Sequence, residues 1–520
     1  MRDRKDRMME EKALAEIYHE ETKYHEAGMA KHQRQLNWAA QPLPYKEYHT
    51  EKKIDLAPYL PFQNNPFTGE PLIPAKDEEG YPFGIGEISR LLYFTNGVTG
   101  ILQYPTGQSL TLRAAPTAGG LYPTEIYVAV QGLSKLENGI YNFQVKDHSL
   151  VPVWEGNFWT EFEKYCMQHE AIAQSNLLII LTAIYQRSAW RYQERAYRRI
   201  LLDTGHILGN LVAYAPEEGF TPYPVGGFVD ASLNRLLFLD ESAEGVLMVV
   251  ALPQSRKTNV QKVRPTSAVP SKYKTAKSEE DVQALQLQLH KVSSISPQAA
   301  NEVSVIEQMP DFTALESRHL EKEAIALPDV PIDWGEGVGQ AILLRRSTRA
   351  LTGEALLKEE LAAILEYAYL PFSSFPLPFF DASLLETYVI VQKVVGLHEG
   401  TYYYAPLKRD LRLLNAGDFR QQTWRFCLGQ ELARDAAALV VHMAPLKKGL
   451  EKYGDRVYRY LHLDAGHIGE RVNLAAIRLG LGVSGIGGFY DDEVNALLGL
   501  SLDRIVVYIT TLGRPKDWNR

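Results

Sequence analysis

The chain has 520 residues, of which 45% are hydrophobic and 23% are charged, as is usual for a globular protein of several domains. Its net charge of −8 argues against non-specific nucleic-acid binding, so no nucleic-acid partner is expected. No stretch reaches the roughly 18 apolar residues of a membrane span, so no membrane partner is expected.

Two further features restrict the location and the kind of site. The N-terminal segment Met1–Arg7 is charged and lacks the apolar core of a secretion signal, so a cytoplasmic protein is expected. Cys166 and Cys427 are the two cysteines, which are too few for a disulfide scaffold or a four-thiolate metal site. We therefore expect buried thiols and no metal.

Residues 1–55 have the pattern of a charged helical arm. Its histidines His19, His25 and His32 lack the four-residue spacing of a helical metal site. The pattern therefore predicts histidines on a solvated helix face.

Residues 56–255 alternate helical and strand-like patterns, which predicts a first α/β domain. Helices are expected over 88–94 and 197–215, and strands over 125–130, 177–184 and 245–252. Residues 256–335 are rich in Lys, Ser, Thr, Gln and Pro, which predicts a linker or insertion with a helix near 279–292. Residues 336–520 are expected to form a second domain.

The clearest feature of the sequence is an internal repeat with a spacing of 261 residues (453 − 192). Tyr192–Arg198 matches Tyr453–Arg459, Asp203–Ile207 matches Asp464–Ile468, and Gly226–Phe228 matches Gly487–Phe489. Agreement at one register over such a distance predicts a duplication of one unit. A duplicated unit is expected to keep the pseudo-two-fold interface of a former homodimer, where cofactor sites are common.

The two halves differ at two segments. The first half has the small, flexible loop Pro116–Gly120, whereas the bulky and acidic Leu377–Asp381 lies 261 residues later. Conversely, Arg345–Arg349 in the second half corresponds to Leu72–Lys76, which has no guanidinium or hydroxyl group. Each half has therefore kept one segment and lost the other.

Both segments have the chemistry of a ligand site. Arg345 and Arg349 offer bidentate donors to a phosphate, and a helix pattern beginning near Leu357 would add the N–H groups of a helix N-terminus. The alternative for this stretch is a solvated basic turn. The loop Pro116–Gly120 lets backbone approach a flat ligand because glycine has no Cβ, and its alternative is a tight turn before a strand.

The sequence resembles the flavin-dependent nitroreductase family, and more narrowly its SagB-type, or azoline dehydrogenase, branch. The resemblance lies in Arg-x-Ser-x-Arg, in Pro-Thr-Ala-Gly-Gly-Leu-Tyr-Pro, in the late Gly-Gly-Phe turn, and in Tyr18–Lys23 and Lys452–Arg459. It implies an α+β fold, in which two fused domains with mainly antiparallel sheets flanked by helices form an internal pseudo-dimer. It also implies one FMN cofactor at the interface of the halves.

The resemblance assigns cofactor binding to residues from both halves. They are Arg345, Ser347, Arg349, Ile486, Gly487 and Gly488 of the second half, with Pro116, Thr117, Ala118, Gly119 and Gly120 of the first. A mirror site would pair Leu72–Lys76 with Pro378–Asp381. That pairing lacks the cations and adds bulk and a negative charge, so we expect it to be empty.

The same resemblance assigns proton transfer to Lys452 and Tyr453. A lysine whose pKa is lowered by burial or by neighbouring cations can act as a general base. The first half has Arg191 and Tyr192 at this place, and that copy is expected to be inactive because arginine does not deprotonate usefully. The alternative is that Lys452 is an exposed lysine near the start of a helix.

Two other motifs have simpler interpretations. Gly480–Gly485 matches G-x-G-x-x-G but follows a helix rather than a strand, which argues against a dinucleotide site. His206 and His467 occupy equivalent places in apolar helices, where a hydrogen-bonded core histidine is expected rather than a ligand.

The leading hypothesis is an FMN-dependent oxidoreductase that oxidises azoline-like peptide substrates. The first alternative is an NAD(P)H-dependent nitro- or quinone reductase, and the second is a non-catalytic binding or scaffold protein. The expected partner is a small-molecule or peptide substrate. The internal pseudo-dimer could remain a monomer or dimerise further.

Overall fold

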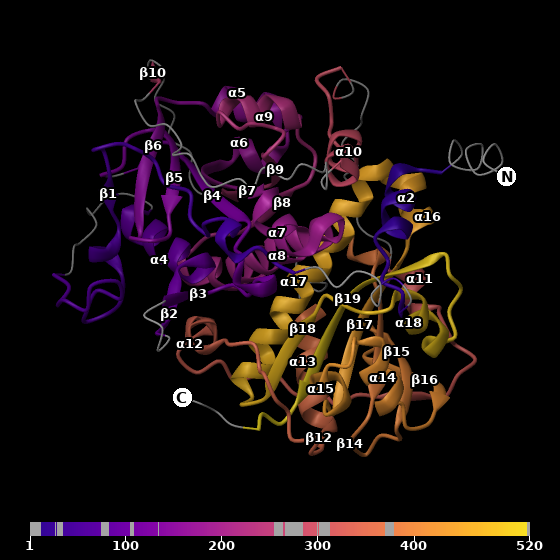
Figure 1. The fold of residues 1–520 in the computed structure, drawn as a ribbon. Helices are drawn as coiled ribbons and strands as arrows, with labels where there is room; N and C mark the ends of the chain where they lie inside the picture. The colour runs from indigo at the N-terminus through magenta and orange to yellow at the C-terminus, as the bar shows by residue number, and fades with distance from the viewer. Residues whose placement is uncertain are drawn as a thin grey trace.

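The computed structural model describes residues 12–26, 28, 35–73, 83–103, 109–133, 135–253, 264–265, 284–298, 300, 312–369 and 379–516. These residues form two similar halves, each built on an antiparallel sheet flanked by helices (Figure 1). The predicted α+β class and the arrangement as an internal pseudo-dimer are confirmed. No helix of the described residues is long and apolar enough to cross a membrane.

The first sheet has the strand order β1-β6-β5-β4-β7-β9-β8, with β10 also paired to β6. Its strands are β1 (Ile54–Asp55), β4 (Thr124–Val130), β5 (Gly139–Gln144), β6 (Ser149–Glu155), β7 (Ser175–Ile184), β8 (Tyr223–Val225), β9 (Glu244–Pro253) and β10 (Arg264–Pro265). The helices are α4 (Ile85–Asn96), α5 (Trp159–Tyr165), α6 (Glu170–Ala173), α7 (Tyr185–Tyr192), α8 (Ala196–Tyr214) and α9 (Asp230–Leu236). A separate hairpin is formed by β2 (Val98–Gln103) and β3 (Ser109–Arg113).

The second sheet repeats this order as β11-β16-β15-β13-β17-β19-β18. Its strands are β11 (Ala324–Ala326), β13 (Glu386–Val391), β15 (Gly400–Ala405), β16 (Asp410–Ala416), β17 (Ala438–Pro445), β18 (Gly482–Ile486) and β19 (Arg504–Gly513). Its helices are α11 (Thr313–Glu316), α12 (Val338–Leu344), α13 (Lys358–Tyr369), α14 (Arg420–Phe426), α15 (Glu431–Arg434), α16 (Leu446–Tyr453), α17 (Val457–Arg478) and α18 (Asp491–Leu498). The short strands β12 (Leu356–Leu357) and β14 (Val394–Val395) pair in parallel.

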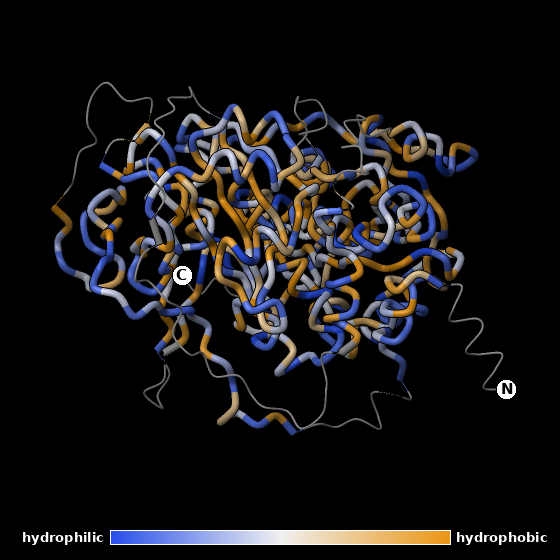
Figure 2. Tube along the Cα trace, turned by 90° about the horizontal axis from the view of Figure 1, so that it is seen from above, coloured by the Kyte–Doolittle hydropathy of each residue, from blue (hydrophilic) through white to orange (hydrophobic). Residues whose placement is uncertain are grey.

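The central strands read as continuous apolar runs because both of their faces are covered. All ten residues of β7 are buried, and so are nine of the ten residues of β9. Figure 2 shows the hydrophobic segments gathered in the middle of the molecule. This burial explains why an uninterrupted apolar run predicted each of these strands correctly.

The two halves meet along the helices α8 and α17, which pack against each other. At their contact, a Cβ built on Gly205 would lie 2.3 Å from the carbonyl oxygen of Leu463. A Cβ on the equivalent Gly466 would lie 2.3 Å from the carbonyl oxygen of Leu202. The two backbones therefore touch directly, which only glycine at both positions permits.

A short helix of the N-terminal arm closes one end of this helix pair. Helix α2 (Leu14–Glu21) packs there through Arg198 of α8, which donates from Nη2 to the carbonyl of His19 at 2.6 Å and from Nε to Oγ1 of Thr22 at 3.0 Å. Arg198 also pairs with Asp491 of the second half at 2.7 Å. His19 is buried in this contact, so its expected place on a solvated helix face is wrong.

Helix α10 (Ala284–Val292), within the expected linker, repeats these contacts for the second half. Arg459 donates from Nη2 to the carbonyl of His290 at 2.6 Å and from Nε to Oγ of Ser293 at 2.8 Å, and it pairs with Asp230 at 2.6 Å. Helices α2 and α10 lie beside each other (Figure 1). The duplication therefore includes the arm, at a spacing of 271 residues (290 − 19).

Three smaller expectations are confirmed. Cys166 and Cys427 are buried free thiols. His206 is a core histidine, with its Nδ1 at 2.7 Å from the carbonyl of Leu202 and its Nε2 at 3.2 Å from Oη of Tyr508. Gly480–Gly485 begins in the turn after α17 and continues into β18, so the motif follows a helix rather than a strand. The expected 256–335 linker is too long, because β11 lies within the second sheet.

Replacing Gly205 tests the contact between the halves. Gly205→Ala should lower the free energy of unfolding by about 2 kcal/mol, because the new methyl group meets backbone that cannot move aside. Urea denaturation of the full chain measures this. The matched control is Gly227→Ala, whose Cβ would lie 3.5 Å from the nearest atom, and its change should stay below about 1 kcal/mol. Equal effects of the two substitutions would contradict the close backbone contact.

Candidate functional site

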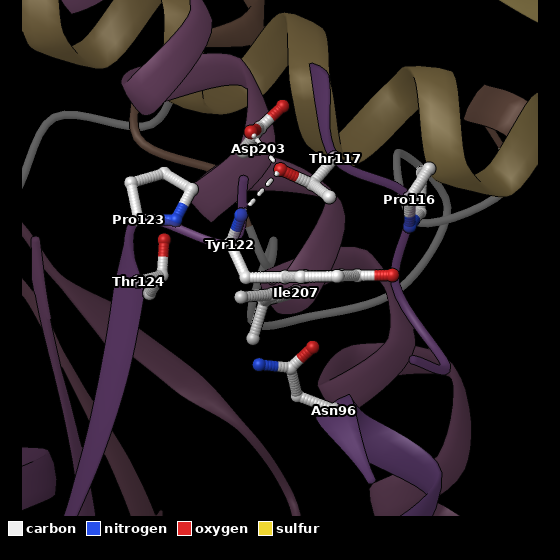
Figure 3. A pocket seen from close by; sticks show the side chains of 8 residues that line it. All are labelled: Asn96, Pro116, Thr117, Tyr122, Pro123, Thr124, Asp203 and Ile207. Carbon is white, nitrogen blue, oxygen red and sulfur yellow. Dashed lines mark hydrogen bonds between the residues drawn. The ribbon is translucent and has the colours of Figure 1, made fainter. Parts of the chain in front are cut away.

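The loop Pro116–Gly120 leads from β3 into a short 3₁₀ turn, η3 (Ala118–Gly120). Gly119 and Gly120 have φ values of 70° and 72°, a left-handed conformation that favours glycine. Thr117 donates its hydroxyl to Asp203 of α8 at 2.6 Å, and the N–H of Ala118 donates to the same carboxylate at 3.1 Å. The loop is thus fixed to the helix at the interface of the halves (Figure 3).

Asp203 is a buried acid whose protonation is poised near neutral pH. Burial raises the pKa of Asp203 to about 7, although the Thr117 hydroxyl, the Ala118 N–H and the Arg199 guanidinium favour the charged form. Behind the loop lies a cavity of about 10 Å³ that is lined by Asn96, Thr117, Asp203 and their neighbours (Figure 3). Since this volume is at the lower limit for one water molecule, the cavity is not the ligand site.

The turn Ile486–Gly488 at the end of β18 faces the first half. A Cβ built on Gly487 would lie 3.4 Å from Nε of Arg199, and one on Gly488 would lie 3.8 Å from the ring of Tyr24. Within the described part of the chain, the N–H groups of Gly487 and Gly488 donate no hydrogen bond. The turn therefore offers two donors beside a cation from the other half.

The stretch Arg345–Arg349 runs along the outer edge of β18. The N–H of Thr348 donates to the carbonyl of Val483 at 2.9 Å, and the Val483 N–H donates to Oγ1 of Thr348 at 2.9 Å. Arg345 crosses to the first half, where its Nε donates to the carbonyl of Ala114 at 2.8 Å. The stretch is therefore bonded to β18, which leads to the turn, and to Ala114, which precedes the loop.

The side chains of this stretch differ in their contacts. Arg346 bonds the carbonyl of Thr99 at 2.8 Å and so belongs to the packing of the halves. Ser347 is half-buried and Arg349 is exposed, and neither side chain has a hydrogen-bond partner among the described residues. Arg349 and Ser347 are therefore available to an anion.

One expectation about this stretch is wrong. Arg345 follows the C-terminus of α12, and the next helix, α13, begins only at Lys358 after the short strand β12. No helix N-terminus therefore stands directly behind the arginines. The apolar pattern over 357–365 predicted the helix correctly but not its distance from Arg349.

The loop Pro116–Gly120, the turn Ile486–Gly488 and the stretch Arg345–Arg349 thus lie along the interface of the two halves, and their assignment to a cofactor stays a prediction. We call this assembly the Thr117 cluster: the loop Pro116–Gly120, the stretch Arg345–Arg349 and the turn Ile486–Gly488, with the side chains of Tyr24, Tyr192, Arg199 and Asp203.

The sequence motifs did not indicate four side chains of this cluster, those of Tyr24, Tyr192, Arg199 and Asp203. The guanidinium of Arg199 lies 3.9 Å from the centre of the Tyr192 ring, and Oη of Tyr192 would lie 2.7 Å from a Cβ on Gly119. The repeat holds the signal for Arg199, because its equivalent 261 residues later is Tyr460.

Lys452 and Tyr453 do not join this cluster. Lys452 pairs with Asp381 at 2.6 Å, and Tyr453 donates to the same carboxylate at 2.8 Å. Burial and the charge of Asp381 raise the pKa of Tyr453. The expected catalytic pair and the expected cofactor residues therefore lie at opposite pseudo-sites. The equivalent residues at the Thr117 cluster are Arg191, which lies beside Gly119, and Tyr192, which belongs to the cluster; they are the copy that was expected to be inactive.

The counterpart of the Thr117 cluster is closed by its own side chains. We call it the Asp381 cluster: Phe380, Asp381, Lys452, Tyr453 and Tyr460 around Gly226. Phe380 and Tyr460 stack with ring centres 5.1 Å apart, and Oη of Tyr460 donates to the carbonyl of Gly226 at 2.8 Å. These rings fill the space beside Gly226. The rest of the expected mirror site, residues 74–76 and 378, lies outside the described residues.

The model of the Nitroreductase family matches residues 87–252 and 342–514, one segment in each half. The chain belongs to the nitroreductase family. Both halves match, so the protein is a tandem nitroreductase, as the internal repeat indicates.

Solved and curated relatives agree. A crystal structure of a nitroreductase-family protein from Anabaena variabilis has a TM-score of 0.82 and 40% identity, and covers 97% of this chain and 100% of that one. The nitroreductase-family protein MJ1384 of Methanocaldococcus jannaschii is 32% identical over 160 residues, which are 31% of this chain and 77% of MJ1384.

A more distant relative is McbC of Escherichia coli, a microcin B17-processing protein. It is 22% identical over 142 residues, which are 26% of this chain and 52% of McbC. The likeness therefore concerns about half of McbC.

The protonation of Asp203 predicts a pH dependence of stability. Its pKa is raised from 3.8 to about 7, so the folded protein holds a proton that the unfolded chain releases. The contribution of Asp203 to the free energy of unfolding is full below about pH 4 and is lost as the pH rises through about 7. Between pH 5 and pH 7.5 the wild type should lose about 2 kcal/mol more than Asp203→Asn, as measured by urea denaturation. The same pH dependence in both proteins would contradict this assignment.

Proposed function

We propose that this nitroreductase is an FMN-dependent oxidoreductase that binds one FMN per chain at the Thr117 cluster. The observation that supports this most directly is the joint position of Arg345–Arg349, the loop Pro116–Gly120 and the turn Ile486–Gly488. Hydrogen-bond donors without protein partners lie there beside backbone that contains glycine. The resemblance of the sequence to flavin-dependent nitroreductases implies that the ligand is FMN.

The available groups fit the two ends of such a cofactor. Arg349 and Ser347 can hold a phosphate, since a guanidinium and a hydroxyl are both suitable donors. The N–H groups of Gly487 and Gly488 and the glycines of the loop can border a flat ring, because no Cβ intervenes. Arg345 is held by Ala114 and serves to join the two halves of the site.

FMN, when bound, supplies the hydride exchange that nitroreductases use. The chain must then hold or deliver a proton. Tyr24 is suited to this role, because Arg199 and Arg195 outweigh the effect of burial and lower the pKa of Tyr24. Tyr192 is a second hydroxyl beside the loop.

The position of Lys452 helps to decide whether the enzyme oxidises or reduces its substrate. A dehydrogenase that uses lysine as a base needs that lysine beside the cofactor, but Lys452 is paired with Asp381 in the other cluster. Arg191 takes the equivalent place in the Thr117 cluster and is a poor base. The arrangement favours a reductase of small molecules, with NAD(P)H as the expected electron donor.

Oxidation of an azoline-like peptide is the second candidate. It is favoured by the likeness to the microcin B17-processing protein McbC and by the SagB-type motifs of the sequence. A non-catalytic scaffold is the third possibility from the sequence, and a chain that takes up no FMN would favour it.

Substitution of Arg349 tests the cofactor site. Arg349→Gln should weaken FMN binding about tenfold, because it removes one charge-assisted hydrogen bond to phosphate from an exposed position. Quenching of FMN fluorescence on titration with the full chain measures the dissociation constant. The matched control is Arg434→Gln, a surface arginine of the same half that pairs with Asp435. If both variants bind FMN as the wild type does, the phosphate is not held by this stretch.

A further inference from the structure

Arg199 is a buried cation without a strong protein partner. Its exposed fraction is 6%, and its Nη1 makes no hydrogen bond among the described residues. Its Nη2 reaches Oη of Tyr24 only at 3.4 Å, and its other close neighbour is the ring of Tyr192. It forms no ion pair with a described carboxylate.

Other buried arginines in the described part of the chain have a carboxylate or a backbone carbonyl as a close acceptor. Arg195 and Arg198 pair with Asp491, Arg456 and Arg459 pair with Asp230, and Arg187 pairs with Glu125. Arg113 and Arg471 form no ion pair, but they donate to the carbonyls of Pro44 and Tyr367. A buried charge without a close acceptor raises the free energy of the folded state. A guanidinium in this situation therefore indicates a binding site for an anion.

The nearby groups do not supply that anion. The carboxylate of Asp203 is engaged by Thr117 and Ala118 and forms no ion pair with Arg199. Arg195, at the N-cap of α8, is a cation that pairs with Asp491 and offers Arg199 no counter-charge. The groups proposed for the FMN phosphate, Ser347 and Arg349, lie along β18 and not at the turn that Arg199 faces.

We propose that Arg199 binds the carboxylate of an anionic substrate beside the turn Gly487–Gly488. This inference rests on the proposed function, because it places the substrate next to the FMN of the Thr117 cluster. Nη1, which is buried without a partner, and Nη2, whose contact with Tyr24 is long, are the two donors of a bidentate guanidinium–carboxylate pair.

A second cation lies beside Gly119 of the loop. Arg191 is exposed, and its Cδ would lie 3.4 Å from a Cβ on Gly119. The ring of Tyr192 is near both guanidiniums, 5.7 Å from that of Arg191 and 3.9 Å from that of Arg199. Two cations close together raise the local positive potential, which attracts an anion.

The anion site belongs to one half of the duplication. At the equivalent position, Tyr460 replaces Arg199 and donates to the carbonyl of Gly226. The guanidinium is therefore present in the Thr117 cluster, which kept the expected cofactor residues, and is replaced in the Asp381 cluster.

A matched pair of nitro compounds tests this proposal. 4-Nitrobenzoate and 4-nitrobenzamide have nearly the same shape but differ in charge. The FMN-loaded full chain should bind the benzoate about ten- to hundredfold more tightly by isothermal titration calorimetry, because one charge-assisted pair is lost with the amide. Arg199→Gln should reduce the ratio of dissociation constants to about one.

Two further variants make the test specific. Arg199→Lys keeps the charge without the planar fork and should keep a smaller preference for the benzoate. Arg434→Gln, a surface substitution, should keep the wild-type ratio. If circular dichroism shows that Arg199→Gln is unfolded, the proposal is tested by comparing the ratio of dissociation constants of the wild type with that of Arg199→Lys.

A wild-type ratio near one, or an unchanged ratio in folded Arg199→Gln, would overturn the proposal. The FMN content is measured separately from the flavin absorbance. A chain with FMN but no preference for the anion overturns this inference alone. A chain that takes up no FMN overturns the proposed function, and titration of that chain with 4-nitrobenzoate still reports whether Arg199 binds the anion.

Discussion

The backbone contact between α8 and α17 at Gly205 and Gly466 is the constraint on which the rest of the structure depends. It brings the two halves close enough for the side chains of one half to reach the loops of the other. Arg199 on α8 can thus face the Gly487–Gly488 turn, and Arg345 can bond the strand end before the loop Pro116–Gly120. A bulkier residue at either glycine would separate the parts of the site.

The same axis relates two clusters that have diverged. The Thr117 cluster keeps small loop residues, donors without partners and an unpaired buried guanidinium. The Asp381 cluster has aromatic rings stacked beside Gly226 and a carboxylate neutralised by Lys452. One cluster has the properties of a binding site, and the other has become part of the packing between the halves. The arms α2 and α10 remain equivalent, because each secures the arginines at the start of one central helix.

Much of the fold could be predicted from the sequence, because the buried strands and the long helices have strong apolar patterns and because the repeat at 261 residues fixes the equivalence of the halves. The repeat of the arm was missed. His290 and Ser293 match His19 and Thr22 at a spacing of 271 residues, and few other identities mark this short helix. The polar composition of the surrounding segment favoured a linker.

The residues expected to bind the cofactor come from motifs that are local in sequence, and their assignment stays a prediction. The position of Lys452 was harder to predict. The motif identifies the lysine, but which pseudo-site it reaches depends on how each helix passes the interface. The local sequence does not determine that geometry. Arg199 could not be identified from the sequence for the same reason, because it is distinguished by its lack of a strong protein partner and by the turn that it faces.

We propose that a duplicated nitroreductase has kept a single cofactor site. The most direct measurement is the FMN content of the full chain after saturation with FMN and removal of the excess by gel filtration, with flavin absorbance compared with protein concentration. We expect one FMN per chain. Two FMN per chain would show that the Asp381 cluster still binds, and none would show that the Thr117 cluster is not a flavin site.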